Sequence, residues 1–137
     1  MLGIEFEAFP VEHSLRAPAV GYRVTAGRRA IFYGPDLVSI VDEQEALSGL
    51  DLYVGDGAVV KRSIVRRRDG RVIGHASIRA QLEWCASARD PPRRIHALRL
   101  RDHQGRRSHR WRAVRSLGSE HGIEALIAHD GLKLTLG

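Results

Sequence analysis

Short β-prone runs, each ended by turn residues, are interspersed with helical patterns along this chain. The runs that predict strands are residues 3–9, 19–25, 30–33, 50–54 and 58–65. The helical patterns cover residues 42–47, 77–86 and 112–121. A charged turn is expected at 66–70, and residues 123–128 and 132–136 predict a C-terminal hairpin. Because strands and helices alternate, we expect an α/β or α+β fold with a mixed sheet.

The bulk composition is that of one globular domain spanning residues 1–137. A chain of 137 residues with 43% hydrophobic and 28% charged residues can bury a sizeable core. No apolar run approaches the roughly 20 residues that a membrane span needs. The single cysteine, Cys85, excludes an internal disulfide framework and fits a reducing compartment. We therefore expect a cytoplasmic protein with no membrane partner.

Histidine and aspartate residues follow several of the predicted strands. His13 comes after the first strand, Asp36 follows a Gly-Pro turn, and His75 stands between Gly74 and a predicted helix. A carboxylate at a strand end is well placed to bridge two cations, and a helix N-terminus favours anions. Each residue also has a structural interpretation as a cap or turn residue, and for Asp56 turn capping and acid–base chemistry are equally open.

These segments, in their order and spacing, resemble the C-terminal half of a metallo-β-lactamase-fold hydrolase. The closest branch is the phosphodiesterases, which include tRNA 3′-end processing nucleases and cyclic-phosphate phosphodiesterases. The segments are Pro10-Val11-Glu12-His13-Ser14, Gly21-Tyr22-Arg23-Val24, Tyr33-Gly34-Pro35-Asp36, Leu50-Asp51-Leu52-Tyr53-Val54-Gly55-Asp56-Gly57, Ile73-Gly74-His75-Ala76-Ser77-Ile78 and Ile127-Ala128-His129-Asp130-Gly131. The resemblance covers about residues 4–88 and 112–136. It implies half of an αββα sandwich, a mixed sheet with helices on one face.

The resemblance also implies a zinc site and roles for five residues. His13 matches a histidine ligand of the first zinc, and Asp36 matches the aspartate that bridges two zincs. His75 matches the Gly-His histidine that contacts the scissile phosphate, and Asp56 lies where an acidic residue stands near the proton shuttle. A last histidine ligand is expected near position 97, where Ala97 stands, so that the neighbouring His96 is the candidate.

The motif His-x-His-x-Asp-His, which supplies most zinc ligands in this family, occurs nowhere in the sequence. Each zinc would keep one or two protein ligands, where three or more are usual. We therefore expect a fragment or subunit that is inactive alone. Its open sheet face predicts a homo-oligomer or a separately encoded N-terminal half as partner.

The positive charge of the chain is concentrated in one segment. The chain carries a net charge of +6, yet residues 89–115 alone hold ten arginines and two aspartates, a net of +8. Residues 89–111 are therefore expected to be divergent and irregular, because the arginines repel one another and few apolar residues oppose the ordering entropy. They suggest an alternative function, a non-catalytic arginine-rich domain that binds nucleic acid through phosphates.

Overall fold

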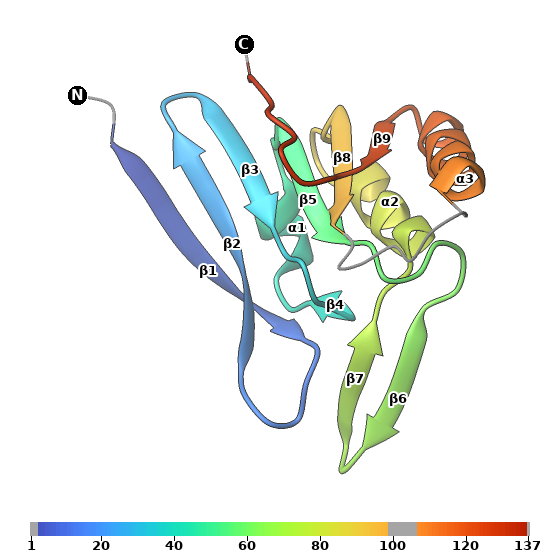
Figure 1. The fold of residues 1–137 in the computed structure, drawn as a ribbon. Helices are drawn as coiled ribbons and strands as arrows, with labels where there is room; N and C mark the ends of the chain where they lie inside the picture. Colours follow the sequence, from blue (N-terminus) through green and yellow to red (C-terminus); the bar gives the residue numbers. More distant parts are fainter. Residues whose placement is uncertain (1–2, 99–106, 137) are drawn as a thin grey trace.

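A computed structural model describes residues 3–98 and 107–136. The described residues form nine strands and three helices (Figure 1). The elements in chain order are β1 (Ile4–Glu12), β2 (Ala19–Ala26), β3 (Arg29–Tyr33), β4 (Ser39–Ile40), α1 (Glu43–Leu47), β5 (Leu52–Asp56), β6 (Ile64–Arg68), β7 (Arg71–His75), α2 (Ile78–Ser87), β8 (Arg94–Leu98), α3 (Arg107–Glu120) and β9 (Glu124–Ile127). Among the described helices, none is long and apolar enough to cross a membrane.

Seven of the strands form one mixed sheet in the order β4-β1-β2-β3-β5-β8-β9, and β6 and β7 form a separate hairpin. The pairs β1–β2, β1–β4 and β2–β3 are antiparallel, whereas β3, β5, β8 and β9 run parallel to one another. Parallel neighbours require crossover connections, and α1, α2 and α3 lie in these connections. The carboxyl ends of β3 and β5 consequently meet at one edge of the sheet.

One face of the sheet packs against the helices and forms the core. Phe32, Tyr53, Ile95 and Ala125 are cross-strand neighbours on β3, β5, β8 and β9, and each is at most 2% exposed. The Phe32 ring stacks on the Tyr53 ring with a centroid distance of 5.6 Å. The helices add buried apolar residues to the same cluster, namely Ala46, Leu47, Ile78, Leu82, Cys85, Val114 and Leu117. Strand alternation thus places one apolar row on the helical side.

The opposite face of the sheet leaves large apolar side chains in solvent. Phe6 is 69% exposed and Ile4 is 62% exposed, and Val20, Tyr22 and Tyr33 are also exposed. The register places Tyr22 beside Tyr33 and Phe6 beside Val24, so that these side chains share one face. Figure 1 shows α1 and α2 behind the sheet, while the C-terminal segment passes in front of β5 and β8. The predicted fold class, a mixed sheet with helices on one face, is confirmed.

The predicted C-terminal hairpin is wrong. Residues 132–136 form no strand, and β9 pairs in parallel with β8. Thr135 and Leu136 instead line a groove together with Arg28, Leu50 and Arg94. The α3 crossover delivers β9 in the parallel direction, so that the turn at 129–131 leads the chain across the sheet rather than along β9.

The predicted irregularity of residues 89–111 is also wrong wherever this segment is described. β8 lies between β5 and β9 with Ile95 only 2% exposed, and α3 begins at Arg107. Ile95 fills the buried row, whereas Arg94 stays at the surface and pairs with Glu124, with 3.1 Å between Nε and Oε2. Residues 99–106 of the predicted segment lie outside the described part of the chain.

The hairpin β6–β7 replaces the strand predicted at 58–65 and the turn predicted at 66–70. The strand β6 begins only at Ile64 and includes Arg66, Arg67 and Arg68, and the turn is made by Asp69 and Gly70. All of β6 is exposed, so that arginines occupy strand positions without desolvation of their charges.

Candidate metal centre

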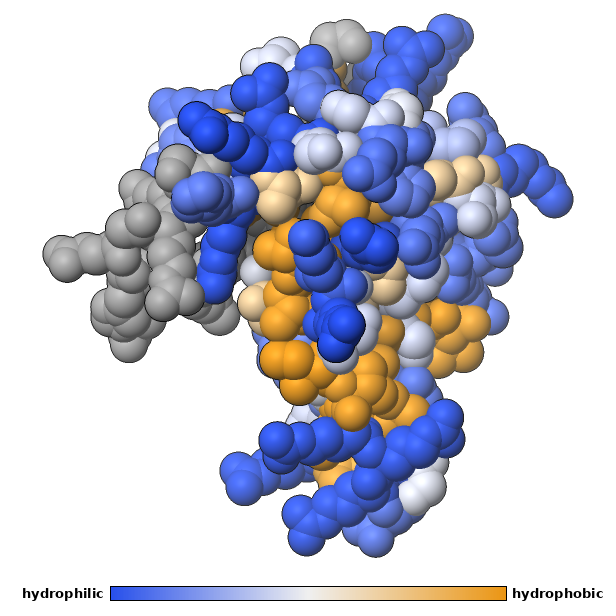
Figure 2. All heavy atoms as spheres, turned by 90° about the vertical axis from the view of Figure 1, so that its right-hand side faces the viewer, coloured by the Kyte–Doolittle hydropathy of each residue, from blue (hydrophilic) through white to orange (hydrophobic). Residues whose placement is uncertain are grey.

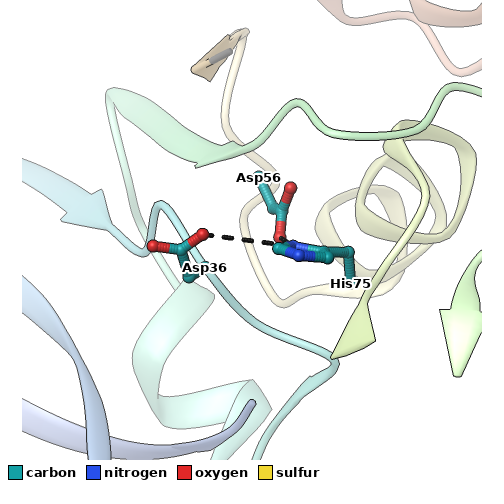
Figure 3. A group of neighbouring side chains, drawn as sticks. All are labelled: Asp36, Asp56 and His75. Carbon is teal, nitrogen blue, oxygen red and sulfur yellow. Dashed lines mark hydrogen bonds and ion pairs between the residues drawn. The ribbon is translucent and has the colours of Figure 1, made fainter. Parts of the chain in front are cut away.

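Three elements bring acidic and imidazole side chains to the same edge of the sheet (Figure 3). Asp36 follows β3, Asp56 is the last residue of β5, and His75 is the last residue of β7. Because β3 and β5 are parallel neighbours, their carboxyl ends place both aspartates together. Ligand atoms of Asp36, Asp56 and His75 all lie within 4.8 Å of one another, so that the group could hold a metal ion.

His75 forms the centre of this group. Its Nδ1 lies 2.6 Å from Asp56 Oδ2 and 4.0 Å from Asp36 Oδ1. The carboxylate can only accept, so His75 Nδ1–H donates to Asp56 and leaves Nε2 as the remaining ring nitrogen. The Asp56 side chain is 2% exposed, whereas those of His75 and Asp36 are 32% and 46% exposed. A substrate therefore reaches Asp36 and His75, but not Asp56.

Asp56 is a buried carboxylate whose hydrogen bonds are all provided by the protein. Oδ1 accepts from the Ala58 backbone N–H at 2.9 Å, and Oδ2 accepts from the Leu37 N–H at 3.2 Å as well as from His75. Such bonds offset the cost of burying a charge. Asp56 thus orients His75, as expected for a carboxylate–histidine pair.

His13 lies beside His75, held by the backbone of Gly74. His13 Nδ1–H donates to the Gly74 carbonyl at 2.8 Å, and the Gly74 N–H donates to the His13 carbonyl at 3.1 Å. The ring centroids of His13 and His75 are 5.1 Å apart. His13 does not belong to the group of donors within 4.8 Å, although it lies next to it.

His96, the remaining predicted ligand, lies within β8. Its backbone is paired with Val54 of β5 and with Leu126 of β9. Its side chain lies outside the described part of the structure, so its role as a metal ligand stays a prediction.

Gln81 of α2 connects the two segments that carry Asp56 and His75. Its Nε2 donates to the carbonyls of Asp56 at 2.8 Å, Ala76 at 3.2 Å and Ser77 at 3.2 Å. Its Oε1 accepts from the Asp56 N–H and the Tyr53 hydroxyl, both at 2.9 Å. Burial, aided by the nearby Cys85 and Asp56, raises the pKa of Tyr53 well above its usual value, so the hydroxyl remains a donor.

The sequence-based prediction missed Gln81. The available signal was a polar residue three positions after Ile78 on the apolar face of the helix, and Gln81 is indeed only 2% exposed.

Replacing Gln81 with leucine should lower the free energy of unfolding by about 2–4 kcal/mol, because several buried polar groups would lose their partners. Urea denaturation followed by circular dichroism measures the change. Gln44→Leu, on the exposed side of α1, is the matched control and should change stability by no more than about 0.5 kcal/mol. Equal effects of the two substitutions would contradict the role assigned to Gln81.

Comparison with known families gives the relationship of this chain. The model of a beta-lactamase superfamily domain matches residues 1–97, which include β1 through most of β8. The chain belongs to the beta-lactamase superfamily. No curated protein matches the chain significantly. The match contains all four residues placed around the centre, His13, Asp36, Asp56 and His75.

The donor set of this beta-lactamase superfamily domain fits a divalent metal ion. Two carboxylates and one imidazole provide the oxygen and nitrogen ligands that such ions take in proteins. Asp56 and His75 are hydrogen-bonded to each other, and a carboxylate in this position holds the imidazole tautomer and raises its basicity as a ligand. Asp36, with its half-exposed carboxylate, is the donor of the group that is open to an ion from solvent.

Proposed function

We propose that the chain is a metal-dependent hydrolase of the phosphodiesterase type that uses zinc. The observation that carries the proposal is the convergence of Asp36, Asp56 and His75 at one sheet edge of a beta-lactamase superfamily domain. In this proposal Asp36 and His13 hold the metal, with His96 as a further ligand. A bound zinc would lower the pKa of a coordinated water and neutralise charge on a phosphate.

His75 and Asp56 are assigned to proton transfer. Asp56 accepts the Nδ1 proton at 2.6 Å and thereby stabilises the protonated imidazole. The Nε2 atom of His75 then delivers a proton to, or takes one from, an oxygen of the bound phosphodiester. Because Asp56 is buried and held by backbone N–H groups, it keeps the imidazole in one orientation throughout.

We propose further that a second copy of this chain, or a separate polypeptide carrying the missing motif, completes the centre. The sequence lacks His-x-His-x-Asp-His, and two zinc ions require about three or more ligands each. The exposed apolar residues Ile4, Phe6 and Tyr22 are the surface on which such a partner would sit. The buried free thiol of Cys85 is compatible with the cytoplasm as the compartment.

Zinc-dependent hydrolysis of bis(4-nitrophenyl) phosphate, measured over a range of protein concentrations, tests this function. With zinc present, the rate per chain should rise with concentration as copies associate, and excess EDTA should abolish it. Analytical ultracentrifugation of the same samples gives the oligomeric state. A dimer that shows no zinc-dependent hydrolysis would refute the hydrolase proposal and favour the alternative, a non-catalytic arginine-rich domain that binds nucleic acid.

A further inference from the structure

The hairpin β6–β7 with the residues before it forms a basic arm, defined here as residues 61–71. The arm carries six basic residues and one acidic residue, a net charge of +5. Every residue of the arm is exposed, and Figure 1 shows the hairpin projecting from the body of the domain. Figure 2 shows strongly hydrophilic side chains spread at this lower end, below an apolar area of the surface.

One face of the arm lines a groove with a volume of about 390 Å³. The cationic side chains of the groove come from Arg16, Arg66 and Arg68. Apolar residues, among them Ile64 and Ile73, provide the rest of its wall. A groove of this size is near the lower end of the roughly 300–1,000 Å³ typical of ligand sites, which suits one nucleotide unit at a time.

The groove leads to the metal centre. In the hairpin register Arg66 lies opposite Ile73, and Ile64 lies opposite His75, so that Arg66, Arg68 and His75 share one face. His13, whose ring neighbours that of His75, lines the groove itself. A ligand lying in the groove would therefore extend from the arginines to the imidazoles.

The positive charge in the groove is not compensated from within. Among the described residues, no carboxylate forms an ion pair with Arg16, Arg66 or Arg68. Arginine presents a planar fork of donors that matches a phosphate group in a bidentate geometry, which lysine does not. Arg66 and Arg68 are two positions apart on one strand, a spacing of about 6.6 Å, so that each can contact a different phosphate.

We propose that this groove binds single-stranded nucleic acid and leads its backbone to the metal centre. The phosphates lie on Arg16, Arg66 and Arg68, and one nucleoside packs on the apolar wall. This inference rests on the proposed phosphodiesterase function, because it names the substrate class of the same site. Recurring phosphates along the arm, beside a centre assigned to phosphodiesters, favour a nucleic-acid strand over an acidic peptide.

Fluorescence anisotropy of a labelled 12-nucleotide single strand, as RNA and as DNA, tests the inference with the full chain in EDTA. Wild-type protein should bind with an affinity that falls steeply as salt rises. Arg66→Gln/Arg68→Gln should weaken binding at least tenfold and reduce the salt slope by about two, one for each lost phosphate contact. The matched control is Arg28→Gln/Arg93→Gln, which removes the same charge from a groove lined by Arg28 and Arg93 elsewhere on the domain and should change binding less than twofold.

Two results would overturn the inference. Equal losses in both double variants would mean that overall charge alone attracts the strand. Tighter binding of poly-glutamate than of the strand would identify an acidic polypeptide as the ligand. Because binding is measured without metal, its outcome is independent of the hydrolysis assay, and failure of the phosphodiesterase proposal remains distinguishable from failure of the groove.

Discussion

Asp36→Asn should lower zinc-dependent diester hydrolysis by roughly a thousandfold. The carboxylate is the exposed donor of the centre, and its loss removes a metal ligand from a group with few described donors. A metal ion contributes several kcal/mol to transition-state stabilisation, and each 1.4 kcal/mol corresponds to about a factor of ten in rate. Steady-state rates with saturating zinc measure the effect, and equilibrium dialysis should show weakened zinc binding by the same variant.

The stability of the Asp36→Asn variant should change by no more than about 0.5 kcal/mol, because the side chain is 46% exposed. Asp42→Asn provides the matched control, since Asp42 is exposed and its side chain forms no capping bond to α1. The control should retain the wild-type rate and zinc affinity. A wild-type rate in Asp36→Asn would remove Asp36 from the centre.

Gly74→Ala should destabilise the domain by about 3 kcal/mol or more and disorder the arrangement of the two histidines. Gly74 has a φ of +130°, which side-chain-bearing residues rarely adopt, and a Cβ there would collide with the backbone carbonyl of Ile64. Backbone strain of this kind costs about 1–3 kcal/mol, and overpacking adds a similar amount. Gly74 also holds His13 through two hydrogen bonds, so the substitution should reduce hydrolysis as well.

Gly70→Ala separates the two causes. Gly70 sits in the turn of the same hairpin with a φ of +75°, but a Cβ there would meet no atom within 4 Å. It should cost only about 1–2 kcal/mol from backbone strain, and His13 and His75 should keep their positions. Chemical denaturation gives the energies, and histidine NMR signals report on the rings. Equal costs at both glycines would mean that the contact with Ile64 is relieved by a small shift.

The fold class and most elements could be predicted because their signals are local. Alternating runs near β1, β2 and β3 and the apolar face of α2 lie in short windows, where side-chain period decides the structure. The segments at 94–98 and 132–136 could not be assigned in this way. Whether such a segment forms a strand depends on the neighbour that pairs with it, and β8 gains two neighbours while residues 132–136 gain none.

The candidate site divides in the same manner. Asp36, Asp56 and His75 could each be singled out because they follow predicted strands, and the structure brings these three together. The hydrogen bond between Asp56 and His75 joins residues 19 positions apart, and the Gln81 bonds to Asp56 span 25. Neither leaves a trace in a sequence window.

By itself, the amino-acid sequence determined the mixed α/β class, the residue types available for a metal and the density of arginine. Only the tertiary structure decided that Asp56 holds His75, that Gln81 fixes both of their segments, and that arginines of an exposed hairpin share a face with the imidazole. The physical reason is that residue type and period act within a few positions along the chain. Hydrogen bonding, burial and charge compensation are properties of residues that meet only when the sheet has formed.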